Sequence, residues 1–112
     1  MSHQENQSLI TALNECAAAC NHCFSACLSE KDVTMLAACI KLDRDCADIC
    51  LTVSSFLSRS SEHGKHLLKE CIEICEKCAA ECEKHASMSM EHCKQCAEAC
   101  RKCAEACKVM AA

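Results

Sequence analysis

The chain has 112 residues and a formal net charge of −4, with no proline, one glycine and 16 cysteines. It has no Trp or Tyr and its Lys and Arg residues are scattered, so it offers neither a stacking platform nor a basic patch for nucleic acid. No apolar run reaches the ~18 residues that span a membrane, and the polar beginning lacks the regions of a signal peptide. We therefore expect a cytoplasmic protein of one domain, residues 1–112.

The cysteines fall into four groups, spaced mostly by three or four residues, and this spacing places side chains on one stripe of an α-helix. The predicted helix at 5–28 carries Cys16, Cys20, Cys23 and Cys27. The predicted helix at 32–58 carries Cys39, Cys46 and Cys50. The predicted helix at 63–85 carries Cys71, Cys75, Cys78 and Cys82. The predicted helix at 90–109 carries Cys93, Cys96, Cys100, Cys103 and Cys107.

Short polar breaks separate these helices. The first break, 29–32, predicts a cap that opens the second helix, and the second break contains the only glycine, Gly64. In the third break, Ser87 or Ser89 is the expected cap of the last helix. Because short connections make consecutive helices antiparallel neighbours, the predicted fold class is all-α, an up-down-up-down four-helix bundle with a Cys-lined core.

A metal is the expected occupant of that core. Two thiolates at i and i+4 can converge on one ion, whereas a disulfide between them would distort the helix, because their Cβ atoms lie ~5–6 Å apart and a disulfide needs ~3.8 Å. Zinc needs a closed set of four ligands, and a continuous stripe does not supply discrete sets of four. Cu(I) accepts two or three sulfurs, and each thiol that exchanges its proton for Cu(I) leaves the core without net charge. We predict several Cu(I) ions per chain.

The two ends of the bundle differ. Toward one end the stripes continue into Met35, His85 and Met90, with Met88 and His92 nearby. Thioether and imidazole bind Cu(I) more weakly than thiolate, so this end is the predicted entrance. The alternative is that the two stripe methionines fill space and His85 lies on the surface. The other end is predicted to be closed by an apolar plug of Leu9, Leu13, Val53, Leu57, Leu67 and Leu68.

The second helix has a gap in its stripe at Asp43. Its carboxyl either accepts hydrogen bonds or binds a metal within the core, or it rotates toward solvent and leaves Leu42 inside, and we favour the latter. Surface positions are expected for the histidines off the stripes, which are His3, His22, His63 and His66.

Three segments resemble the cytosolic copper storage proteins: Cys20-Asn-His-Cys-Phe24 with Cys27, the stretch from Cys39 to Cys50, and the ending from Cys96 to Met110. The resemblance covers nearly the whole chain. It implies a four-helix bundle that stores many Cu(I) ions in each protomer, usually as a homotetramer, with copper reached through an end that carries His or Met. One departure is the last loop, which carries Met88 and Met90 where cytosolic members tend to be rich in His.

The function that these patterns favour is high-capacity storage of Cu(I). A chaperone needs about two exposed thiolates, a sensor needs a surface that reads DNA, and an enzyme needs an open coordination site. Two alternatives stay open. One is sequestration of zinc or cadmium, as in metallothioneins, and the other is a structural bundle regulated by reversible disulfides.

Overall fold

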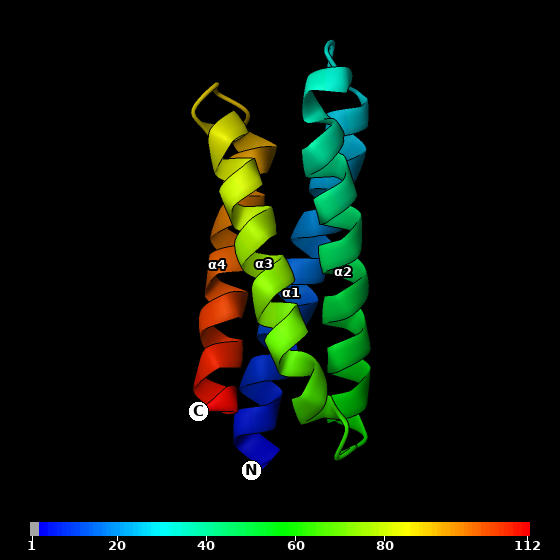
Figure 1. Cartoon of the computed structure of the whole chain (residues 1–112), viewed down its shortest axis with the longest axis vertical. Helices are drawn as coiled ribbons and strands as arrows, with labels where there is room; N and C mark the ends of the chain where they lie inside the picture. The colour runs from blue at the N-terminus through cyan, green and yellow to red at the C-terminus, as the bar shows by residue number, and fades with distance from the viewer. Residues whose placement is uncertain (1–2) are drawn as a thin grey trace.

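The computed structural model describes residues 3–112, and side chains from residue 6 onward; the position predicted for His3 therefore lies outside the described side chains. Four long helices follow one another: α1 (His3–Leu28), α2 (Ala37–Ser58), α3 (Gly64–Ala86) and α4 (Glu91–Ala111). A short 3₁₀ helix, η1 (Thr34–Leu36), precedes α2. Figure 1 shows the helices alternating in direction, and the described residues contain no strand. The predicted all-α up-down-up-down bundle is thus confirmed.

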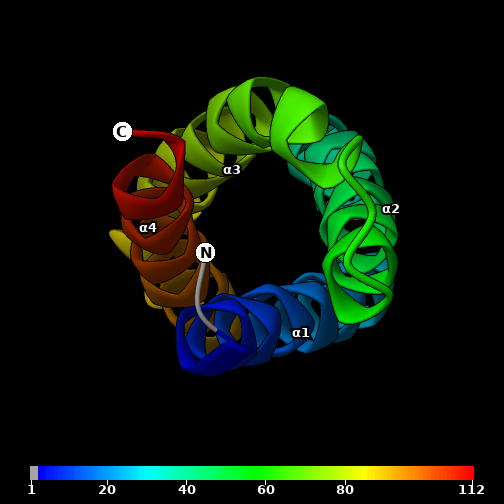
Figure 2. The ribbon, with the colours of Figure 1, turned by 90° about the horizontal axis from the view of Figure 1, so that it is seen from below.

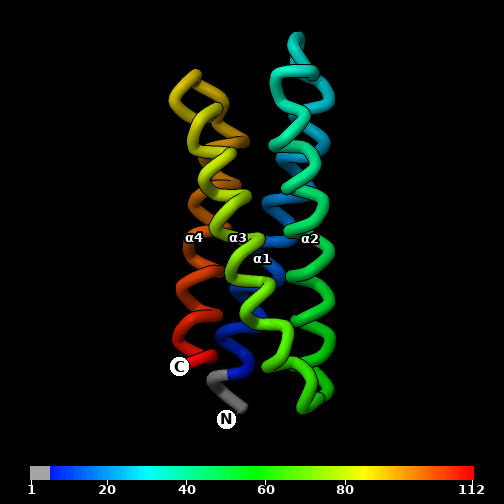
Figure 3. Tube along the Cα trace, in the orientation of Figure 1, coloured from blue at the N-terminus to red at the C-terminus, as the bar shows by residue number. Residues whose placement is uncertain are grey.

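The bundle is an elongated ring of helices. Its principal extents are 45 × 19 × 18 Å. Seen along its axis in Figure 2, each helix packs against the one before and the one after, with α4 closing the ring on α1. Consequently α2 and α4 lie diagonally opposite, as do α1 and α3. The chain trace in Figure 3 places the α1–η1 and α3–α4 connections at one end and the α2–α3 turn at the other.

The second helix begins later than its predicted start at residue 32. The Asp32 carboxylate accepts a hydrogen bond from the Met35 amide at 3.3 Å, and the Leu36 amide donates to the Val33 carbonyl at 3.0 Å. These i to i+3 bonds wind the chain as a 3₁₀ turn before α2 starts. Because a 3₁₀ turn advances fewer residues per turn than an α-helix, the side chain that faces the interior changes: Leu36 is buried and Met35 is 39% exposed.

The connection before α4 also differs from prediction. Ser87 Oγ donates to the Lys84 carbonyl at 2.7 Å, so this hydroxyl serves the end of α3, and Ser89 adopts a left-handed conformation with φ 68°. Residue Met90, in extended conformation, precedes α4, and no side chain caps the helix. The expectation that a serine caps α4 was therefore wrong. The other boundaries agree with the predicted ranges to within two residues.

Cysteine and alanine fill the middle of the bundle, and larger apolar side chains close one end. All 16 cysteines are buried, together with small neighbours such as Ala47 and Ala79. The predicted plug is present: five of its six residues are buried and Leu67 packs partly buried against them. Gly64 begins α3 beside this plug, where an added Cβ would lie 3.0 Å from Leu57 Cδ2. Among residues 3–112, no helix has the length and apolar character needed to cross a membrane.

Candidate metal centre

The four cysteine stripes meet along the axis of the bundle. Each sulfur points inward because every cysteine stripe lies on the face of its helix that packs against the neighbouring helices. Sulfurs from different helices approach closely: Cys39 and Cys82 are 3.5 Å apart, and Cys46 and Cys75 are 3.7 Å apart. Within single helices, the i,i+4 pairs in contact at 3.8–4.0 Å are Cys23–Cys27, Cys71–Cys75 and Cys96–Cys100. The interior is therefore a connected column of thiols.

The sulfurs form groups of four in which all members lie within 4.8 Å of one another. Five of these groups are Cys16/Cys46/Cys50/Cys75, Cys16/Cys20/Cys46/Cys100, Cys20/Cys78/Cys96/Cys100, Cys23/Cys27/Cys39/Cys93 and Cys50/Cys71/Cys75/Cys103. Sets of four do exist across helices, contrary to the argument from the sequence. Six residues belong to two sets, however, so at most three of the five can be filled with unshared sulfurs. Shared sulfurs favour ions that accept bridging thiolates.

All 16 cysteines are free thiols. The sulfur separations, 3.5 Å and longer among the described contacts, are those of neighbouring thiols rather than of a disulfide at ~2.05 Å. Burial, followed by the negative charge of Cys39, raises the pKa of Cys93 to about 11. Hydrogen bonds from the thiols of Cys23 and Cys82 lower the pKa of Cys39 to about 3. The group Cys23/Cys27/Cys39/Cys93 thus combines Cys39, which releases its proton readily, with Cys93, which keeps its proton at neutral pH.

Asp43 faces the core, so the preference for a solvent-facing orientation was wrong. Its side chain is fully buried, whereas Leu42 is partly exposed. The carboxyl oxygens lie 3.3 Å from the sulfurs of Cys78 and Cys96, 3.7 Å from Cys82 and 3.8 Å from Cys39. Burial, and then the charges of Cys96 and Cys39, raise its pKa to about 9, which keeps it protonated at neutral pH. Four thiol partners make the inward orientation favourable, because a buried polar group needs hydrogen bonds.

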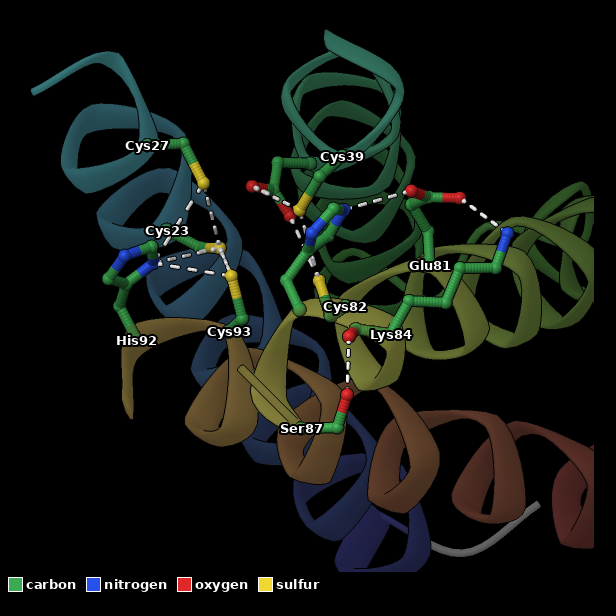
Figure 4. A network of polar contacts seen from close by, with 11 residues as sticks. Cys23, Cys27, Cys39, Glu81, Cys82, Lys84, Ser87, His92 and Cys93 are labelled. Carbon is green, nitrogen blue, oxygen red and sulfur yellow. Dashed lines mark hydrogen bonds and ion pairs between the residues drawn. The ribbon is translucent and has the colours of Figure 1, made fainter. Parts of the chain in front are cut away.

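One end of the column carries imidazoles, shown in Figure 4. His92 Nδ1 lies 3.5 Å from the sulfur of Cys93, 3.6 Å from Cys23 and 3.8 Å from Cys27. From the sequence, we predicted only that His92 lies near the entrance, because His92 is one position off the cysteine stripe of α4. The first turn of α4, however, brings it over the sulfurs of α1.

The other predicted entrance residues have different environments. His85 is buried, which excludes the surface alternative for this residue. Met90 is partly buried and packs against the core. Met35 and Met88 lie on the surface, with 39% and 53% of each residue exposed, so Met35 does not continue the stripe of α2. The remaining histidines, His22, His63 and His66, are exposed as expected.

Comparisons with known proteins agree with this arrangement. A family model described as copper storage protein matches residues 2–112. The cysteine-rich protein YhjQ of Bacillus subtilis (strain 168) is 44% identical over 73 residues, which are 65% of this chain and 68% of that protein.

Two solved structures are similar over most of the chain. The Cu(I)-bound copper storage protein BsCsp3 is 44% identical, with a TM-score of 0.90 over 96% of this chain and 99% of the other. A cytosolic copper storage protein from Streptomyces lividans, loaded with five coppers, is 40% identical, with a TM-score of 0.92 over 96% of this chain and 92% of the other.

Proposed function

Because the chain belongs to the copper storage protein family and stores Cu(I), we propose that its 16 buried thiols are the ligands that hold the ions. The observation that carries this proposal is the sharing of sulfurs between neighbouring sets of four. A thiolate that belongs to two sets can bridge two ions, and Cu(I) with two or three sulfurs tolerates such bridging. The structure of the Streptomyces lividans copper storage protein with five coppers supports the binding of several ions.

The capacity follows from the ligand count. If each thiolate bridges two ions and each ion holds two thiolates, the ceiling is about one Cu(I) per cysteine. Each ion replaces one thiol proton, so the filled core stays close to neutral and avoids the large free-energy cost of buried charge. The family is one of storage proteins rather than enzymes, and we assign the chain no catalytic role.

Copper enters, in this proposal, at the end of the column that carries His85 and His92. The opposite end is closed by buried Leu13, Val53 and Leu68, which offer no ligand atom. At the histidine end, His92 Nδ1 lies against three thiols, so an ion bound by the imidazole is already within reach of the column. We also propose a cytosolic location, in keeping with the relative described as cytosolic, and a homo-oligomer, a tetramer by family resemblance.

The experiment that tests storage is an anaerobic titration of the apo protein with Cu(I) against a competing chelator, with Zn(II) titrated in parallel. Storage by bridging thiolates predicts that more than about four Cu(I) ions bind tightly, because sulfurs are shared. Zinc in separate tetrahedral sites would stop at four ions or fewer, because 16 cysteines supply at most four unshared sets of four. Fewer than about four tight Cu(I) ions would contradict storage.

A further inference from the structure

Both histidines at the entrance pair their Nε2 with a carboxylate. His92 Nε2 lies 3.3 Å from Glu30 Oε1, while its Nδ1 faces Cys23, Cys27 and Cys93. Glu30 lies in the turn that follows α1, so this contact joins that turn to the start of α4. Figure 4 shows the imidazole of His92 directed toward the cysteine sulfurs.

His85 on α3 has the same pairing of Nε2 with a glutamate. Its Nε2 lies 3.1 Å from Oε2 of Glu81, one helical turn earlier, and the Glu81 side chain is only 16% exposed. Its Nδ1 is buried and has no hydrogen-bond partner among the described residues. A buried polar atom without a partner is rare, and here it belongs to a group that can bind Cu(I).

The carboxylates determine which ring nitrogen carries the proton. An ionised carboxylate only accepts hydrogen bonds, and a neutral imidazole has one N–H. A carboxylate at Nε2 therefore places the proton there and leaves the lone pair on Nδ1. Without the carboxylate, the ring can turn, or Nδ1–H can donate to a thiolate, and in either case the lone pair no longer faces an incoming ion.

We propose that Glu30 and Glu81 are positioning residues for copper uptake: each holds an entrance imidazole with Nε2–H bound outward and the Nδ1 lone pair directed at the site. This inference rests on the proposed uptake of Cu(I) at the histidine end. The two glutamates contact the histidines and none of the described thiols, so they act on the rate of loading and leave the number of ions unchanged.

The first test is made without copper. In the ¹⁵N-labelled apo protein, kept reduced at a fixed pH above neutrality, the nitrogen chemical shifts of His85 and His92 report which nitrogen is protonated. We expect Nε2–H for both in the wild type. Glu30→Ala should increase the Nδ1–H form of His92 alone, and Glu81→Ala that of His85 alone. Glu30→Gln and Glu81→Gln, whose amide oxygen still accepts a hydrogen bond, should keep the wild-type pattern.

The second test measures uptake from a Cu(I)–chelator complex by stopped flow. The alanine variants should load roughly ten-fold more slowly, the usual range for loss of a residue that orients a ligand, and reach the wild-type number of ions. The glutamine variants should load close to the wild-type rate. Glu91→Ala is the matched control: it removes one negative charge beside His92, and Glu91 has no ion pair or hydrogen bond among the described side chains.

The outcomes separate this inference from the proposed function. Unchanged nitrogen shifts in the alanine variants would overturn the inference, even if uptake slowed, because the effect would then come from charge. Equal slowing in the glutamine or Glu91→Ala variants would also overturn it. A wild-type protein that binds few Cu(I) ions would instead contradict the storage function, and the shifts measured without copper would still decide the role of the glutamates.

Discussion

The Asp43 carboxyl on α2 lies 3.3 Å from the Cys96 sulfur on α4, the helix diagonally opposite in the ring. The same oxygen also lies 3.3 Å from Cys78 on α3. Asp43 contacts two other helices at once because its position on the stripe of α2 points toward the axis of the bundle. Its carboxyl thus interrupts the column of thiols with a single protonated acid.

This protonated carboxyl makes the stability of the apo protein depend on pH. Burial raises its pKa from 3.8 to about 9, so between these values the native state binds a proton that the unfolded chain releases. The contribution of Asp43 to the free energy of unfolding should therefore fall as the pH rises across this window, by up to about 1.4 kcal/mol per pH unit. The lowered pKa of Cys39 contributes in the opposite direction. Asp43→Asn should remove this contribution, so that its free energy of unfolding falls less, or rises more, with pH than that of the wild type, as measured by urea unfolding under reducing conditions between pH 5 and 8.

The control for that measurement is Asp45→Asn. Asp45 is exposed and close in sequence, so its replacement should leave the slope unchanged. A slope that is the same in the wild type and in Asp43→Asn would mean that Asp43 is ionised in the native state.

Copper capacity should depend on where a cysteine lies in the column. Cys100 has sulfur neighbours from α1, α2 and α4, at 3.7–4.0 Å, whereas Cys107 makes none of these sulfur contacts within the described part of the chain. Cys100→Ala should lower the number of tightly bound Cu(I) ions by about two, because a bridging sulfur serves two ions, and Cys107→Ala by about one at most. Chelator-competition titrations of both variants decide this, and equal losses would argue against bridging.

The entrance should depend on imidazole more than on thioether. His92 Nδ1 faces three thiols, whereas Met35 is turned to the surface by the 3₁₀ turn. We expect His92→Ala to slow Cu(I) uptake by about ten-fold without loss of capacity, and Met35→Ala to load close to the wild-type rate. Stopped-flow loading is the measurement. Equal rates for His92→Ala and the wild type would show that ions do not pass this imidazole.

The apolar plug should support stability without serving copper. Leu13 is fully buried, and Leu13→Ala should lower the free energy of unfolding by about 3 kcal/mol through lost burial and the cavity that remains. Val109 is 79% exposed, so Val109→Ala should change it by less than about 0.5 kcal/mol. Both variants should bind as many Cu(I) ions as the wild type. If Leu13→Ala is shown to be folded and still binds fewer Cu(I) ions, some ions must lie in the plug.

Bound copper should stabilise the fold. The apo bundle has four long helices and a complete apolar plug, so it should fold without metal. Because native thiols are gathered and unfolded ones are dispersed, Cu(I) binds the native state preferentially, and a thousand-fold excess over the dissociation constant adds about 4 kcal/mol per independent site. Thermal unfolding monitored by circular dichroism should show a higher midpoint with Cu(I), and removal of the metal by a strong chelator should reverse the shift.

The spacing of the cysteines along the sequence predicted much of the architecture. Steps of three and four define a helical stripe through local geometry, so the four helices, the inward cysteines and the apolar end followed without knowledge of the tertiary contacts. The chemistry of the thiols likewise favoured Cu(I), because softness and charge belong to the residue type. Family membership and the similar copper-loaded structures agree with that reading.

The sequence by itself therefore determined which faces of the helices carry sulfur and which end is closed. Only the tertiary structure decided the positions of Asp43, Met35 and His92. Asp43 turns inward because thiols from two other helices hydrogen-bond a carboxyl that burial keeps neutral. Met35 turns outward because the connection to α2 winds as a 3₁₀ turn. His92 reaches the sulfurs of α1 because the ring closes α4 against α1, and no spacing along one helix encodes that contact.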